Sequence, residues 1–242
     1  MRSRRRRPTA AAARGAEANP STTARQRAST GELARIAQRL FRLAPLRERT
    51  LARLRPWICP FDELVSLLPS RAHVLDIGCG NGLLLGLAAS QGHVESAIGI
   101  DADARAISTA SQMALHAFPQ RLRFSCTRAE DPWPAGPCSV ISLIDVMHHV
   151  DPSHQLTLLD RACAAVPKGG MLVYKDMAER PRWRAGANRL HDLILARQWI
   201  HYLAIDSVVS RGQAQGLALV RRSTTARFCY QHELAVFMRP LI

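Results

Sequence analysis

The sequence predicts an α/β protein with a doubly wound, mostly parallel sheet of seven strands and an N-terminal helical extension. Three observations predict this class. From about residue 71, short β-branched runs alternate with helix-like segments, which is typical of βαβ units. The composition, 47% hydrophobic and 21% charged over 242 residues, is that of a globular chain. A glycine-rich turn follows the first of these runs.

The charge of the chain is distributed unevenly. Residues 1–30 contain eight arginines and one glutamate, and residues 31–59 contain seven arginines and two glutamates. Residues 60–242 are almost balanced, with 18 basic and 16 acidic side chains, although the whole chain carries +14. We therefore predict a disordered arginine-rich tail over residues 1–30, a helical region over 31–70 and the main domain over 71–242.

The helical region divides at prolines. Thr30 is predicted to cap a first helix that begins at Gly31. Its apolar stripe is formed by Leu33, Ile36, Leu40 and Phe41. Pro45 interrupts this helix, and a second is expected over residues 46–54. A third is expected over residues 61–68.

The main domain supplies the strands in order. Strands are expected at residues 73–77, 94–100, 122–126, 139–145 and 171–175. Helices are expected between them at residues 82–90, 104–117 and 153–166. A further helix over 205–215 should end at Gly216, and the runs 217–221 and 234–238 complete the seven strands.

The sequence also indicates a compartment. The six cysteines form no C-x-x-C pair, so we expect free thiols in a reducing environment. The N-terminus lacks the apolar segment of a secretory signal, and no apolar run reaches the roughly 18 residues of a membrane span. We expect a cytoplasmic protein, although the composition of residues 1–29 also matches a transit peptide.

The most informative segment is residues 74–82, which read Val-Leu-Asp-Ile-Gly-Cys-Gly-Asn-Gly. A strand with Asp76 near its end runs into glycines that open a helix. Glycines let a ligand approach the backbone, and in open α/β sheets ligands bind at the carboxyl ends of the strands. Leu83 stands where the nicotinamide-binding pattern G-x-G-x-x-G has its third glycine, and the chain has no P-loop pattern.

This segment closely resembles motif I of the class I S-adenosylmethionine-dependent methyltransferases, and the resemblance extends over about residues 60–242. It implies the Rossmann-like methyltransferase fold, with residues 71–242 as the methyltransferase domain, and S-adenosylmethionine as the cofactor. The cofactor-binding residues that it implies are Asp76, Gly78, Cys79, Gly80, Asp101, Ala102, Ala129, Glu130 and Asp145.

Within the resemblance, Gly78 and Gly80 would contact the methionine part of the cofactor. Asp101 ends the second strand and would accept hydrogen bonds from both ribose hydroxyls. At the adenine position, Arg128 stands where many relatives have an acidic residue. Either Ala129 and Glu130 cover the adenine, or the register is shifted.

Methyl transfer requires an aligned acceptor and, for many acceptors, removal of a proton. The catalytic candidates, at the end of the fourth strand, are Asp145, His148 and His149, with Asp176 nearby after the fifth. Histidine titrates near neutrality, which suits a base, although a loop-fixing role for the pair stays open. We expect no metal, because Asp145, His148, His149 and His154 lack further acidic ligands at matched spacing.

The acceptor is expected to be a small, hydrophobic metabolite that is methylated on oxygen, carbon or nitrogen. The loop at residues 144–148 has no [ND]-P-P-[YF] pattern, which disfavours a nucleic-acid base. An insertion at about residues 177–203, with Trp183, Trp199 and Tyr202, is predicted to form a lid. Packing helices or membrane association remain alternatives for it.

A second functional hypothesis is a nucleic-acid-associated protein of the same fold. The arginine-rich N-terminus would then anchor phosphates. Residues 1–30 contain no aromatic residue to stack on bases, so we do not expect a nucleic-acid partner.

Overall fold

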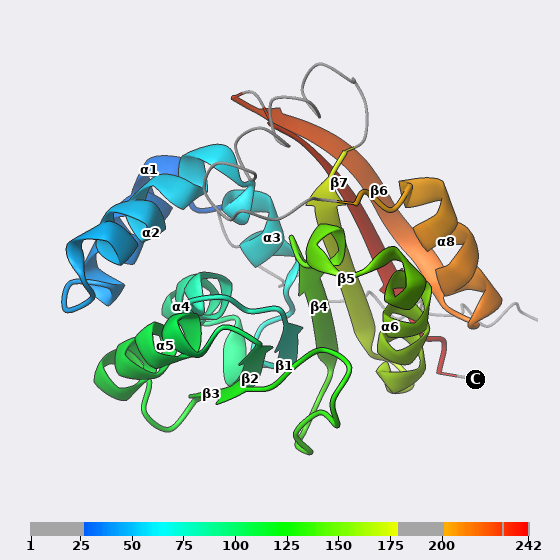
Figure 1. Ribbon diagram of the computed structural model, residues 1–242, viewed down its shortest axis with the longest axis horizontal. Coiled ribbons are helices and arrows are strands. Elements are labelled where there is room, and N and C mark those ends of the chain that lie inside the picture. Colours follow the sequence, from blue (N-terminus) through cyan, green and yellow to red (C-terminus); the bar gives the residue numbers. More distant parts are fainter. Residues whose placement is uncertain (1–26, 179–200, 229, 242) are drawn as a thin grey trace, which may run out of the picture.

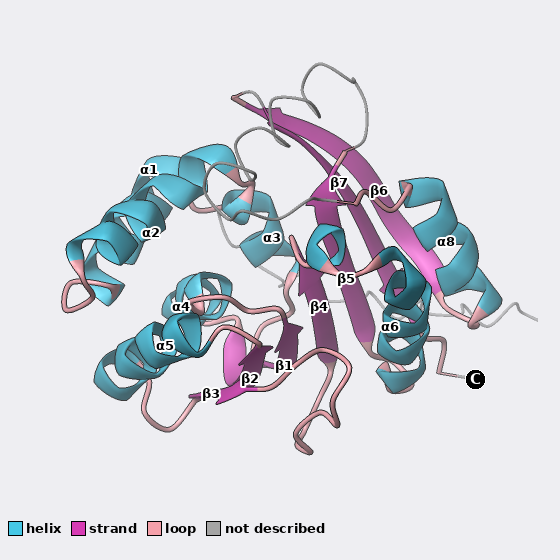
Figure 2. Cartoon of the chain, in the orientation of Figure 1, coloured by secondary structure: helices cyan, strands magenta, loops and turns pink. Residues whose placement is uncertain are grey.

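The computed structural model describes residues 27–178, 201–228 and 230–241. These residues form one seven-stranded sheet in the order β3-β2-β1-β4-β5-β7-β6, with helices on both faces (Figures 1 and 2). The first five strands are parallel, and β7 runs antiparallel between β5 and β6. The predicted fold class is confirmed.

The elements have the following bounds. The strands are β1 (Ala72–Ile77), β2 (Val94–Asp101), β3 (Leu122–Cys126), β4 (Val140–Ile144), β5 (Met171–Met177), β6 (Ala218–Arg227) and β7 (Tyr230–Met238). The helices are α1 (Thr30–Leu40), α2 (Leu46–Ile58), α3 (Phe61–Leu67), α4 (Leu83–Ser90), α5 (Ala104–Ala117), α6 (Pro152–Ala165) and α8 (Ile205–Ala214), with a 3-10 turn, η1, at Met147–His149.

The central strands are buried on both faces, as parallel strands require. Val74 of β1 faces a core built with α1, α3, α4 and α5, whereas its neighbour Leu75 faces a second core built with α6 and α8. Strands β2 and β3 lie on one side of β1, and the chain crosses to the other side between β3 and β4. The carboxyl ends of β1 and β4 therefore flank the reversal in strand order, where such sheets bind ligands.

Two features of the N-terminal helices differ from the prediction. Ser29, not Thr30, caps α1, because its side chain accepts a hydrogen bond from the Glu32 N–H over 3.2 Å. Helix α2 continues past residue 54 to Ile58, since Pro56 is accommodated inside it and buried.

The ends of strands β4, β6 and β7 also differ from the prediction. Strand β4 stops before Asp145, which takes a positive φ of 55°. Strands β6 and β7 are longer than the apolar runs suggested, because polar residues of β6 face carboxylates on α3. Arg221, Ser223 and Thr225 donate to Glu63, and Arg227 donates to Asp62.

Two predicted regions fall mostly outside the described residues. These are the tail, of which residues 1–26 are not described, and the lid, of which residues 179–200 are not described. Met177, placed at the start of the lid, belongs instead to β5. Within the described residues, no helix combines the length and apolar character that crossing a bilayer would require.

Candidate active site

The glycine turn between β1 and α4 forms the floor of the site. Gly78 and Gly80 both take positive φ values, 73° and 54°. A Cβ on Gly78 would lie 2.3 Å from a methyl group of Val146, so packing requires glycine there. A Cβ on Gly80 would meet no atom within 4 Å. The Gly80 backbone therefore faces open space that a ligand can approach.

Asp101 closes one side of this turn from the end of β2. Its Oδ2 accepts a hydrogen bond from the Gly80 N–H over 2.8 Å, and its Oδ1 accepts from the Asp103 N–H over 2.9 Å. A carboxylate has about four acceptor sites, so each oxygen keeps capacity for a further donor. Asp101 can accept two hydrogen bonds from a vicinal diol.

A cavity of about 200 Å³ lies over the turn; we call it the turn cavity. The expected cofactor residues that line it are Asp76, Gly78, Cys79, Gly80, Asp101 and Asp145. Arg55, Phe61 and Asn81 line it as well, and the sequence analysis did not single them out. Asn81 lies within the motif and could have been found there, whereas nothing in the sequence brings Arg55 of α2 to this place.

Three expected cofactor residues, Ala102, Ala129 and Glu130, do not line the turn cavity. The Ala129 carbonyl accepts from the Trp133 ring N–H over 2.9 Å and from the Arg161 guanidinium over 3.1 Å. The Arg161 guanidinium also holds the Glu130 carbonyl, at 3.0 Å. Their contact with adenine therefore stays a prediction.

Asp76 lies beneath the turn and is almost wholly buried. Burial raises the pKa of its carboxyl to about 7, although the hydrogen bond from the Ser142 hydroxyl, 2.6 Å long, opposes this. A positively charged ligand group near Asp76 would favour its ionised form.

A second cavity of about 280 Å³ adjoins the first; we call it the histidine cavity, after His148, His149 and His232 in its wall. Its apolar lining includes Leu51, Ile58, Met177 and Tyr230. The two cavities share Arg55, Asn81, Asp145 and His149. The catalytic candidates His148, His149 and Asp145 are thus brought together, and two of them border both cavities.

Asp145 forms a buried ion pair with Lys175. The Lys175 Nζ lies 2.6 Å from each Asp145 carboxylate oxygen and 3.5 Å from the Cys59 Sγ. Burial alone would raise the pKa of Asp145, but the surrounding cations, led by Lys175, hold that pKa below its usual range. Burial raises the Cys59 pKa to about 11, so its thiol stays protonated. Asp145 is therefore a fixed anion.

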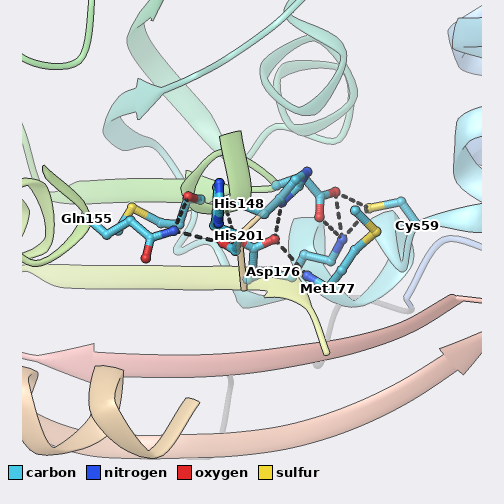
Figure 3. A network of polar contacts seen from close by, with 9 residues as sticks. Cys59, His148, Gln155, Asp176, Met177 and His201 are labelled. Carbon is cyan, nitrogen blue, oxygen red and sulfur yellow. Dashed lines mark hydrogen bonds and ion pairs between the residues drawn. The ribbon is translucent and has the colours of Figure 1, made fainter. Parts of the chain in front are cut away.

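His148 is paired with Asp176 in the wall of the histidine cavity (Figure 3). Its ring Nδ1 bonds one Asp176 oxygen, and its backbone N–H donates to the other over 3.1 Å. The loop is held further by the Gln155 amide, which donates to the carbonyls of Met147 and His201, each over 2.8 Å. With Nδ1 donating to the carboxylate, Nε2 is the nitrogen that can accept a proton.

His232 of β7 was missed by the sequence analysis. Its Nε2 lies 2.7 Å from the Ile58 carbonyl, which only accepts, so this nitrogen carries the hydrogen. Its Nδ1 and the Oδ1 of Asn81 are buried polar atoms that have no hydrogen-bond partner in the described structure. Burial lowers the pKa of His232 to about 4, so the ring is neutral near pH 7.

Asp145, His148 and Asp176 bring one potential metal ligand each within 4.8 Å of one another. The Lys175 ammonium already supplies a positive charge to Asp145, and Asp176 is engaged by His148. This pairing accounts for the three side chains without a metal ion.

The chain was compared with known proteins. A family model described as a methyltransferase domain matches residues 33–222. No curated protein matched the chain. Because the family model covers most of the chain, the chain belongs to the methyltransferase-domain family. The predicted family and enzyme class are confirmed.

Solved structures with the same fold include the N-methyltransferase NodS from Bradyrhizobium japonicum WM9 in complex with S-adenosyl-l-homocysteine. NodS is 21% identical, with a TM-score of 0.61 over 85% of this chain and 98% of that one. Magnesium protoporphyrin IX methyltransferase ChlM from Synechocystis PCC 6803, with bound SAH, is 16% identical, with a TM-score of 0.60 over 81% of this chain and 88% of that one.

A third structure with this fold is the [4+2]-cyclase SpnF. It is 14% identical, with a TM-score of 0.60 over 79% of this chain and 83% of that one. At these identities the likenesses establish the fold, and the reaction has to be argued from the site.

Proposed function

We propose that this chain transfers a methyl group from S-adenosylmethionine, bound in the turn cavity, to a small apolar acceptor in the histidine cavity. The observation that carries the proposal is the shared wall of Arg55, Asn81, Asp145 and His149 between the two cavities. A donor and an acceptor in these places would meet along that wall, as in-line transfer requires.

The residues of the turn cavity fit the cofactor. Gly80 leaves a space that any Cβ would enter, and Asn81 offers a buried oxygen that has no partner. Asp101 suits a ribose diol, and Asp76 suits an ammonium group. S-adenosylmethionine supplies an activated methyl group at a sulfonium, so the protein has to position the acceptor and, for an O–H or N–H acceptor, take up a proton.

His148 is the proposed proton acceptor. Asp176 holds its Nδ1–H and would stabilise the imidazolium after proton uptake, as a carboxylate does in a catalytic triad. Asp145 is a weaker candidate, because its ion pair with Lys175 lowers the pKa of the carboxyl, so the carboxylate takes up a proton less readily than a histidine. We assign Asp145 to positioning and to the electrostatic field at the shared wall. His149, exposed between the cavities, would contact donor and acceptor.

The acceptor is proposed to be a small, hydrophobic metabolite. Leu51, Ile58, Met177 and Tyr230 support this, because an apolar wall with a few polar groups is typical of small-molecule sites. The reducing cytoplasm remains the proposed compartment. The five described cysteines, Cys59, Cys79, Cys126, Cys138 and Cys163, are all free, which fits that assignment.

The test is a product screen. The purified chain is incubated with isotopically labelled S-adenosylmethionine and a cell extract, and mass spectrometry searches both the small molecules and the nucleic acid of the extract for the labelled methyl group. A labelled apolar product that the His148→Gln variant forms more slowly is the expected result. Label in nucleic acid instead, or in no compound although the cofactor binds, would contradict the proposed function.

A further inference from the structure

Helix α2 exposes the residues that a helix normally buries. Its large apolar side chains Leu46, Leu51, Leu54 and Trp57 are 69%, 45%, 51% and 47% exposed. The residues that it buries are the small Ala52 and the helix-interior Pro56. Helix α1, which packs beside it (Figure 1), is amphipathic in the usual sense and buries Leu33 and Ile36.

The exposed apolar residues of α2 form a continuous face. Leu46, Leu54 and Trp57 lie close to two and three turns apart, at about 3.6 residues per turn, so they share one side of the helix. Leu51 lies about one turn before Leu54, at the edge of this side. We call Leu46, Leu51, Leu54 and Trp57 the α2 outer face. An exposed apolar patch of this kind marks a docking surface.

Exposed arginines accompany the α2 outer face, on α2 itself and on the adjacent α1. The exposed arginines of α1, α2 and the turn between them are Arg35, Arg39, Arg42, Arg47, Arg49 and Arg53. Within the described residues none of the six forms an ion pair, whereas Arg71, Arg211 and Arg227 pair with Glu95, Asp160 and Asp62. The partner that fits this charge is anionic.

We propose that the α2 outer face docks on the surface of an anionic lipid bilayer. Leucine and tryptophan side chains would enter the boundary between headgroups and acyl chains, while the flanking guanidinium groups contact lipid phosphates. A nucleic acid fits less well, because aliphatic side chains do not stack on bases and Trp57 is the one aromatic residue of this face. A protein partner, including a second copy of this chain, is an outcome that the test below distinguishes.

The same helix connects this face to the site. Leu51 belongs to the α2 outer face and also lines the histidine cavity, together with Arg55 and Ile58 of the last turns. Docking would therefore place the histidine cavity near the bilayer. An apolar acceptor could then enter the histidine cavity from the lipid, and this step rests on the proposed function. Docking itself does not rest on it, because vesicle binding is measured without turnover.

The test is co-sedimentation of the full chain with vesicles of phosphatidylcholine, alone or mixed with an equal amount of phosphatidylglycerol. We expect binding to the mixed vesicles that salt weakens, and little binding to phosphatidylcholine. The double variant Leu54→Asn/Trp57→Gln should bind about tenfold or more weakly, since it removes two inserted apolar groups. Its matched control is Leu115→Asn, which replaces an exposed leucine of α5 and should bind like the wild type.

A second pair of variants tests the charge. Arg49→Gln/Arg53→Gln should weaken vesicle binding, whereas Arg128→Gln, which removes an arginine that pairs with Glu130, should not. If the Leu54→Asn/Trp57→Gln variant binds the mixed vesicles as tightly as the wild type, the affinity belongs to another part of the chain, such as the N-terminal tail, and the proposal is overturned. It would equally be overturned by binding to single-stranded RNA but not to vesicles, or by a dimer that this variant dissociates and that does not bind vesicles.

Discussion

The Gly80 backbone N–H donates a hydrogen bond to Oδ2 of Asp101 over 2.8 Å. This bond ties the glycine turn after β1 to the carboxyl end of β2, and the Gly78 and Cys79 N–H groups reinforce it by donating to the Ile100 carbonyl. The turn and the carboxylate thus form one preorganised unit. A ligand that contacts both would not have to order either of them.

Replacing Asp101 by Asn should weaken binding of S-adenosylhomocysteine by about 1.5–3 kcal/mol, the scale of hydrogen bonds to a charged group. An asparagine keeps one acceptor oxygen and turns an NH₂ group toward one of the two N–H donors. Isothermal calorimetry measures the change. Glu95→Gln, on the same strand and paired with Arg71, is the control and should bind normally. Equal affinity in both variants would show that Asp101 does not hold the ribose.

Affinity for S-adenosylhomocysteine should rise as pH rises through about 7. Burial places the pKa of Asp76 at about 7, and the ammonium group of the ligand favours the ionised carboxylate. Below that pH the complex forms at the cost of releasing a proton, so affinity should fall by up to about tenfold per pH unit. Calorimetry at several pH values measures the slope. The Asp76→Asn variant, which can still accept a hydrogen bond from Ser142, should show no such dependence of affinity on pH. A dependence that persists in this variant would belong to another titrating group.

His148→Gln should lower methyl transfer about 10²–10⁴-fold, the usual contribution of a general base, with unchanged affinity for S-adenosylhomocysteine. Asp176→Asn should lower turnover less and shift the pH–rate profile, because an amide oxygen can still accept from Nδ1. His154→Gln, on the exposed start of α6, is the control. The rates are measured with the acceptor that the product screen identifies. Full turnover in His148→Gln would leave the histidine without a catalytic role.

His232 should make the fold sensitive to mild acid. Burial lowers its pKa to about 4, against about 6.5 in the unfolded chain. Between these values the unfolded state binds a proton that the folded state does not. Stability is therefore complete above about pH 6.5 and falls with decreasing pH, by at most about 1.4 kcal/mol per pH unit for this residue. Urea unfolding at several pH values should show a shallower slope in His232→Asn than in the wild type.

The fold could be predicted from local pattern, because the central parallel strands are short buried runs and helices α4, α5 and α6 connect successive strands, although a loop joins β3 to β4. Asp103 and Asp151 cap α5 and α6 through their side chains. The longer β6 could not be predicted. Its polar residues become a strand because Glu63 and Asp62, more than 150 residues earlier, face them.

The two cavities of the site also differ in how far the sequence predicts them. The side that binds the cofactor is contiguous in sequence from Asp76 to Gly82, so a motif could reveal it. The histidine cavity is assembled from α2, η1 and β7, which meet through the fold alone. Arg55 and His232 carry no local pattern, and the partners of Asp145 and His148, at Lys175 and Asp176, lie on a different strand.

The most direct test of the account compares two glycines that both have positive φ values. Gly80 and Gly216 have φ values of 54° and 79°, and neither has an atom closer than 3.8 Å to the place of an added Cβ. Gly80 faces the turn cavity, whereas Gly216 follows α8, away from it. Calorimetric titration with S-adenosylhomocysteine should show binding to the wild type and to Gly216→Val and none to Gly80→Val, with similar thermal unfolding of the two variants. Unchanged binding by Gly80→Val, or no binding by the wild type at millimolar ligand, would contradict the account.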